Sequence, residues 1–117
     1  MPTASASLSA ITAGPDGNLW FTESVGNKIG RVTPAGEFAE FPVPTANAGP
    51  GDIAAGPDGN LWFTESFRPQ IGRITTGGAV TEYPIPSPAG GVAAGADGNV
   101  WFTEVDANKV ARFVLKP

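Results

Sequence analysis

The stretch ITAGPDGNLWFTES at residues 11–24 returns as IAAGPDGNLWFTES at residues 53–66 and as VAAGADGNVWFTE at residues 92–104. The first two copies start 42 residues apart and the last two start 39 apart. The shorter spacing reflects a shorter connection after Pro86 than after Pro44. Self-similarity with a period of about 40 residues is typical of folds built from repeated supersecondary units. This repeat therefore decides the fold class.

A complete unit has the pattern of four short strands. In the first unit the predicted strands cover residues 9–14, 18–23, 28–33 and 37–44. The turn between the first two contains Pro-Asp-Gly, where glycine supplies the positive φ of a tight hairpin. Pro42 and Pro44 cannot donate to a sheet ladder, so the fourth strand suits an outer edge. The chain is therefore predicted to be all-β, with four-stranded antiparallel sheets.

The second strand of each unit is apolar on both faces, because Leu19 and Phe21 project to one side and Trp20 to the other. Such a strand must be covered on both sides. No sustained helical periodicity is present, and glycine or proline interrupts every long stretch. Blades of a β-propeller, packed face to face, satisfy this pattern, with an all-β solenoid as the weaker alternative. We therefore expect Trp20, Trp62 and Trp101 to lie between blades.

The predicted domain is a single partial propeller over residues 1–117. Its blade units cover about residues 9–44, 51–86 and 90–117, and the third lacks a fourth strand. The Asp-Gly pairs at 16–17, 58–59 and 97–98 are predicted to be hairpin turns rather than cation ligands. The sequence further predicts that Tyr83 is a packing variant of Phe41. We expect a carboxylate or a blade-linking carbonyl beside each of three recurring arginines, Arg31, Arg73 and Arg112.

Composition excludes several function classes. The 117 residues include 7 basic and 11 acidic ones, without a basic cluster, so neither nucleic acid nor an acidic membrane is an expected partner. Cysteine and histidine are both missing, which excludes disulfides, thiolate metal sites and histidine-dependent catalysis. The N-terminus has neither a basic start nor an apolar run, so we expect a cytoplasmic or recombinant soluble protein without a signal peptide.

The run GPDGNLWFTE, followed by NKIGRVT at 27–33 and EFPVP at 40–44, resembles a blade of the virginiamycin B lyase (streptogramin lyase) family. The resemblance covers residues 2–117. It implies a seven-bladed propeller and a magnesium-assisted elimination that linearises type B streptogramin antibiotics. The positions that match the family's catalytic histidines are Ser9, Gly51 and Gly90. We therefore predict no catalytic residues, and lyase activity reconstituted in an oligomer remains an alternative.

The family's catalytic glutamate matches Glu23, Glu65 and Glu104. A hairpin centred between Asp16 and Gly17 would put Glu23 opposite Ala10, so all three glutamates are predicted to ring one mouth of the channel. Carboxylates held close together raise one another's pKa or recruit a cation. No cofactor is required, but this mouth is a hypothetical weak Mg²⁺ or Ca²⁺ site and a possible small-ligand module. The alternative is that each glutamate accepts hydrogen bonds from backbone amides of the next blade.

An arc of three blades leaves one apolar blade face open at each end. Large apolar patches rarely stay exposed, and a head-to-tail contact closes only if the rotation divides a full turn. Two copies give six blades and three give nine, so we predict a homodimer, with a homotrimer as the alternative. Residues 11–24 and 53–66 match at 13 of 14 positions, which indicates recent amplification or an engineered origin. The predicted function is a self-assembling partial propeller without evident catalytic activity.

Overall fold

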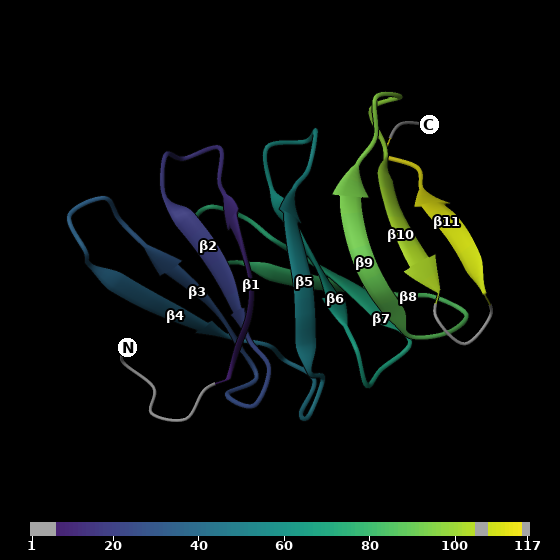
Figure 1. The fold of residues 1–117 in the computed structure, drawn as a ribbon, viewed down its shortest axis with the longest axis horizontal. Helices are drawn as coiled ribbons and strands as arrows, with labels where there is room; N and C mark the ends of the chain where they lie inside the picture. Colours follow the sequence, from purple (N-terminus) through teal and green to yellow (C-terminus); the bar gives the residue numbers. More distant parts are fainter. Residues whose placement is uncertain (1–6, 105–107, 116–117) are drawn as a thin grey trace.

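The computed structural model describes residues 7–104 and 108–115, and the regular structure there consists of strands alone (Figure 1). The strands are β1 (Leu8–Ala13), β2 (Leu19–Glu23), β3 (Lys28–Val32), β4 (Phe38–Pro42), β5 (Pro50–Ala55), β6 (Leu61–Glu65), β7 (Gln70–Ile74), β8 (Val80–Pro84), β9 (Ala89–Ala94), β10 (Val100–Glu104) and β11 (Lys109–Phe113). Across these ranges, no segment forms a helix that could cross a membrane.

The strands form three antiparallel sheets with the orders β1-β2-β3-β4, β5-β6-β7-β8 and β9-β10-β11. The predicted all-β class and its blade-like sheets are thereby confirmed. In the described part of the chain the third sheet has three strands. Pro42 and Pro84 lie in the edge strands β4 and β8, where a missing N–H disturbs no further ladder. The innermost strands β1, β5 and β9 lie side by side (Figure 1).

The hairpin turn of each blade orients its tryptophan. In blade 1, the Gly14 N–H donates to the Asn18 carbonyl at 2.8 Å, and Gly17 has φ 84°. These features define a three-residue loop that ends in a left-handed residue. The Asp16 carboxylate accepts hydrogen bonds from the Asn18 backbone and from Trp20 Nε1, the latter at 3.0 Å. Asp58 and Asp97 repeat this arrangement, so the predicted Asp-Gly turns are confirmed.

The predicted register of this hairpin is wrong. Glu23 lies opposite Leu8 and not opposite Ala10. One reason is that the loop has three residues, so its centre is Asp16. The second is a bulge between Leu8 and Ile11, which shifts the pairing again. Thr22 Oγ1 accepts the bulged Ala10 N–H at 3.1 Å, so a side chain satisfies the amide that the bulge removes from the ladder.

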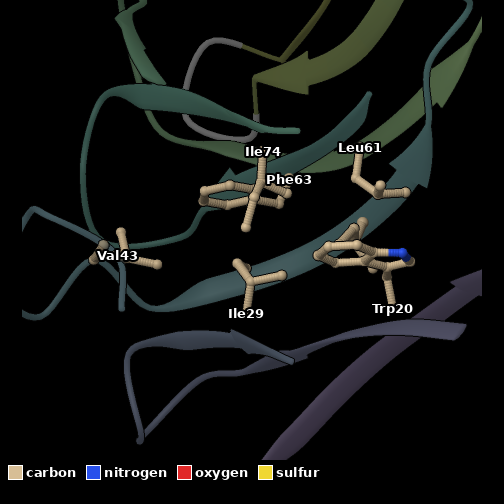
Figure 2. Packing of buried hydrophobic residues seen from close by; sticks show 8 residues of the cluster. Trp20, Ile29, Val43, Leu61, Phe63 and Ile74 are labelled. Carbon is tan, nitrogen blue, oxygen red and sulfur yellow. The ribbon is translucent and has the colours of Figure 1, made fainter. Parts of the chain in front are cut away.

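The core consists of two interfaces between consecutive sheets. In the first, Trp20 and Ile29 of blade 1 pack with Leu61, Phe63 and Ile74 of blade 2 (Figure 2). The second interface joins blades 2 and 3 and contains Trp62, Ile71, Ala89, Val92, Val100 and Phe102. Trp20 and Trp62 are 0% and 1% exposed, which confirms their predicted place between blades. Trp101, at the open end of the arc, is half-buried.

Aromatic and arginine side chains complete each interface. Phe41 stacks on Trp20 with ring centroids 5.7 Å apart, and Tyr83 stacks on Trp62 at 5.6 Å, so Tyr83 is the packing variant expected. Each arginine lies over the tryptophan of its own blade. The polar partners are the Thr76 carbonyl for Arg31 at 3.1 Å, Asp58 for Arg73 at 3.9 Å and Asp97 for Arg112 at 3.3 Å. These are the two kinds of partner that the sequence predicted.

Candidate functional site

The candidate glutamates end the second strand of each blade and are buried. Glu23 and Glu65 are 0% exposed, and Glu104 is 5% exposed. The structure brings a second glutamate, which sequence reasoning missed, to each of the first two. Glu40 on β4 lies on the same sheet face as Glu23, because β2 pairs with β3 and β3 with β4 in registers that preserve the alternation. Glu82 stands in the same relation to Glu65.

These carboxyl groups form one proton-sharing pair in each of the first two blades. Burial, together with hydrogen bonding and repulsion from Glu40, raises the pKa of Glu23 to about 7, although Lys28 partly opposes the shift. The same causes, with Glu82 as partner, raise the pKa of Glu65 to about 8. Two neighbouring carboxyl groups do not both ionise readily, so Glu23 and Glu65 keep their protons to a higher pH than an isolated glutamate does. The arrangement therefore binds a proton more tightly than an isolated carboxylate does.

The alternative prediction, hydrogen bonds from backbone amides of the next blade, is wrong for Glu23 and Glu65. Neither carboxyl group accepts a hydrogen bond from a backbone amide of the described residues. Glu104 differs from both because its sheet supplies no fourth-strand glutamate. The Ser87 hydroxyl donates to Glu104 Oε1 at 3.0 Å instead. A signal for the carboxyl pairs exists in the sequence, since Glu40 and Glu82 each follow the first glutamate of their blade by 17 residues.

The three predicted channel-mouth carboxylates do not meet within one chain. Among residues 7–104 and 108–115, no three histidine, cysteine, aspartate or glutamate side chains are close enough to hold a metal ion. Mg²⁺ requires near-octahedral oxygen coordination, and Ca²⁺ takes six to eight oxygens. Two buried carboxyl groups that share a proton do not meet that need. The described residues therefore do not fit the family's magnesium ion, and a ring of carboxylates contributed by several copies remains a prediction.

Two of the three positions that match the family's histidines carry hydrogen bonds between blades. Thr22 Oγ1 donates to the Gly51 carbonyl at 2.7 Å, and Thr64 Oγ1 donates to the Gly90 carbonyl at 3.0 Å. Ser9, the third such position, lies exposed on β1. At Gly51 and Gly90 only the main chain participates, so neither position offers a side chain that could accept a proton from a substrate.

The two ends of the arc expose apolar sheet faces. On blade 1, Ile11 and Phe38 are 61% and 44% exposed and border a hollow that Leu8 and Phe21 also line. The equivalent of Ile11 in blade 2 is Ile53, which is only 4% exposed. On blade 3, Val110 is 67% exposed, whereas its equivalents Ile29 and Ile71 are fully buried. We call these surfaces the blade 1 open face and the blade 3 open face.

Comparison with known proteins identifies the family. The family model described as "Virginiamycin B lyase family" matches residues 1–116. A virginiamycin B lyase of Bordetella pertussis is 50% identical over 36 residues, which cover 31% of this chain and 12% of that protein. The chain thus spans a small part of the curated relatives that it matches.

Solved structures agree. The crystal structure of virginiamycin B lyase from Staphylococcus aureus superposes with a TM-score of 0.88 at 36% identity, covering all of this chain and 44% of the other. A streptogramin B lyase structure gives 0.87 at 39% identity, with 43% of that chain covered. A catalytically inactive histidine-to-alanine variant of the S. aureus enzyme, solved with quinupristin, also gives 0.88. The chain belongs to the virginiamycin B lyase family.

Proposed function

We propose that this chain is a structural propeller segment that associates with further copies of itself through its two open faces. The observation that supports this most directly is that the open faces repeat the two halves of an interface already formed inside the chain. Leu19, Phe21 and Val32 on the blade 1 open face match Leu61, Phe63 and Ile74, which pack against Trp20 and Ile29. Trp101 and Val110 on the blade 3 open face match Trp20 and Ile29.

The contact is head-to-tail, so copies form either a closed ring or an open chain. Two copies supply six blades and three supply nine. The chain covers 44% of the S. aureus enzyme, close to three of the seven blades that the resemblance implies. Two copies with that curvature leave a gap about one blade wide, so a dimer closes only if each blade turns through about one sixth of a circle rather than one seventh. We propose the homodimer, with the homotrimer as the alternative.

The test is the mass in solution across a concentration series, measured by sedimentation equilibrium. We expect twice the chain mass of 11.9 kDa at high concentration. Ile11→Lys and Val110→Lys place a charge on opposite open faces and should each return the mass to that of one chain. Val25→Lys is the matched control, because Val25 is 71% exposed but lies in a turn outside both faces. A monomer at every concentration would contradict the proposal.

A charge swap tests whether the two open faces meet each other. Their equivalents Ile53 and Ile29 belong to the same buried cluster. The Ile11→Lys/Val110→Glu double variant places opposite charges across the proposed contact. A 1:1 mixture of the two single variants, Ile11→Lys and Val110→Glu, does the same at one of its two contacts. Association should recover in the Ile11→Lys/Val110→Glu double variant and not in Ile11→Lys/Val110→Lys. Equal behaviour of the two double variants would contradict the pairing.

Lyase activity is the second candidate, favoured by family membership. Against it stand the absence of histidine from the sequence and the inactive histidine-to-alanine variant of the S. aureus relative. Incubating the assembled chain with a type B streptogramin and magnesium, followed by mass spectrometry, discriminates the two candidates. We expect no linearised product, and linearisation that disappears in Ile11→Lys would favour the second candidate. The same preparation, titrated with Mg²⁺ or Ca²⁺ by calorimetry, tests the weaker hypothesis of a cation or small-ligand module.

A further inference from the structure

We infer that the Thr103 hydroxyl donates a hydrogen bond to the main-chain carbonyl of Ser9 in a neighbouring copy, and that this bond fixes the register in which two copies meet. The inference rests on the proposed function, because it specifies the contact between the open faces. Its basis is a threonine hydroxyl that repeats in each blade. In blades 1 and 2 this hydroxyl both accepts and donates a hydrogen bond, and in blade 3 it only accepts one within the described residues.

The first two instances have the same geometry. Thr22 Oγ1 accepts the N–H of the bulged residue Ala10 at 3.1 Å and donates to the Gly51 carbonyl of the next blade at 2.7 Å. Thr64 Oγ1 accepts the Asp52 N–H at 2.9 Å and donates to the Gly90 carbonyl at 3.0 Å. One hydroxyl thus satisfies the bulge of its own blade and ties that blade to its neighbour.

The third instance lacks its second half. Thr103 Oγ1 accepts the Gly91 N–H at 2.8 Å, as the other two threonines accept theirs. The described residues supply no acceptor for its hydroxyl hydrogen, and Thr103 is exposed on the blade 3 open face. The repeat spacing makes Ser9 the equivalent of Gly51 and Gly90, and Ser9 is exposed on β1 of blade 1. One open face therefore carries the donor and the other carries the matching carbonyl.

This hydrogen bond fixes the register between two copies, which apolar contact alone does not. Hydrophobic contact is non-directional, so by itself it tolerates sliding of one sheet over another. Sliding one sheet along the other keeps the same apolar face inward and changes only which side chains meet across the contact. A hydroxyl-to-carbonyl hydrogen bond requires a donor–acceptor distance near 2.7–3.0 Å, so such sliding breaks it. Thr103 is accordingly a positioning residue for association.

Thr103→Val removes the hydroxyl at nearly constant shape, and Thr103→Ser keeps it. Sedimentation equilibrium should show that Thr103→Val weakens association by about 3- to 10-fold for each contact, the range of one net hydrogen bond. Thr103→Ser should associate within about 2-fold of the parent chain. Thr22→Val is the matched control, since its hydrogen bond lies within one chain: it should lower the midpoint of urea unfolding without a comparable change in association.

Thr103→Val also removes the acceptor of the Gly91 N–H inside its own chain. Urea unfolding in the non-associating Ile11→Lys background measures that internal effect by itself. If the parent chain associates and Thr103→Val associates equally well, the inference is wrong and the proposed function stands. Loss of association in Thr103→Ser as severe as in Thr103→Val would also overturn it. If the parent chain is monomeric throughout, the proposed function is wrong.

Discussion

Replacing Glu65 with glutamine should remove about half of the pH dependence of folding stability between about pH 5 and pH 8, because Glu23 supplies the rest. Glu65 is fully buried, its pKa is raised to about 8, and Glu82 is its carboxyl partner. Thr45 donates a hydrogen bond to Glu82 Oε1 at 2.9 Å, so the partner carboxyl group is held in place from its other side. A glutamine amide can donate to Glu82 in the same place without titrating.

The direction in which stability changes with pH follows from the number of protons bound in the folded and unfolded states. The folded state holds a proton on Glu65 up to about pH 8, whereas the unfolded chain releases it near pH 4.5. The folded state therefore binds more protons in this window, and stability falls as pH rises, by up to about 1.4 kcal/mol per pH unit for one such group. Between pH 5 and pH 7 the parent chain should lose on the order of 2–3 kcal/mol through Glu65. Glu23, with its pKa near 7, contributes in the same direction.

The assay is urea unfolding at pH 5.5, 6.5, 7.5 and 8.5, in the Ile11→Lys background so that association does not contribute. The midpoint should fall with pH in the parent chain and about half as steeply in Glu65→Gln, where Glu23 still titrates. Glu104→Gln is the matched control, because the partner of Glu104 is the Ser87 hydroxyl and not a second carboxyl group. A flat profile in the parent chain, or the same slope before and after Glu65→Gln, would refute the proton-sharing account.

Two further predictions concern packing. Gly72→Ala should destabilise the chain by about 1–3 kcal/mol in urea unfolding, because the new Cβ would lie 2.1 Å from Cζ of the fully buried Phe63. Gly77→Ala is its control and should change stability by less than about 0.5 kcal/mol, because the nearest atom to its new Cβ would be Thr75 Oγ1 at an ordinary contact distance of 3.8 Å. Trp62→Ala should cost about 3–5 kcal/mol and Trp101→Ala clearly less in a non-associating background, since only Trp62 is enclosed by two sheets. Equal costs for the two tryptophans would contradict the account of the open face.

The positions of the strands and the buried faces of the sheets could be predicted because the same pattern of apolar residues occurs in three copies. The alternation of Leu61, Trp62 and Phe63 predicts a strand covered on both sides, and all three side chains are buried. Register could not be predicted. It depends on whether the turn holds two or three residues and on a bulge in β1, and both follow from hydrogen bonds of Asp16 and Thr22 that no alternation pattern encodes.

The candidate site was predicted only in part. Its three glutamates were found from the resemblance, but their chemistry depends on the fourth strand. Glu40 and Glu82 change Glu23 and Glu65 from potential metal ligands into proton-sharing acids, whereas Glu104 has a hydroxyl neighbour. Glutamates with the same local sequence thus differ in chemistry, because the side chain beside each one belongs to a different segment of the chain.

Closure of a ring is favoured over a single pairwise contact between two copies. Exposed side chains such as Ile11, Phe38 and Val110 each contribute on the order of 1 kcal/mol of binding free energy when another sheet covers them. The total for one interface is therefore comparable to the low end of the about 4–15 kcal/mol that association costs in lost translational and rotational freedom. A single contact is therefore weak. In a closed ring of two copies the second contact forms within an existing complex, at high effective concentration and without a second loss of freedom. A change on either open face, such as Ile11→Lys, breaks both contacts at once, so its effect on association should exceed that of one lost side chain.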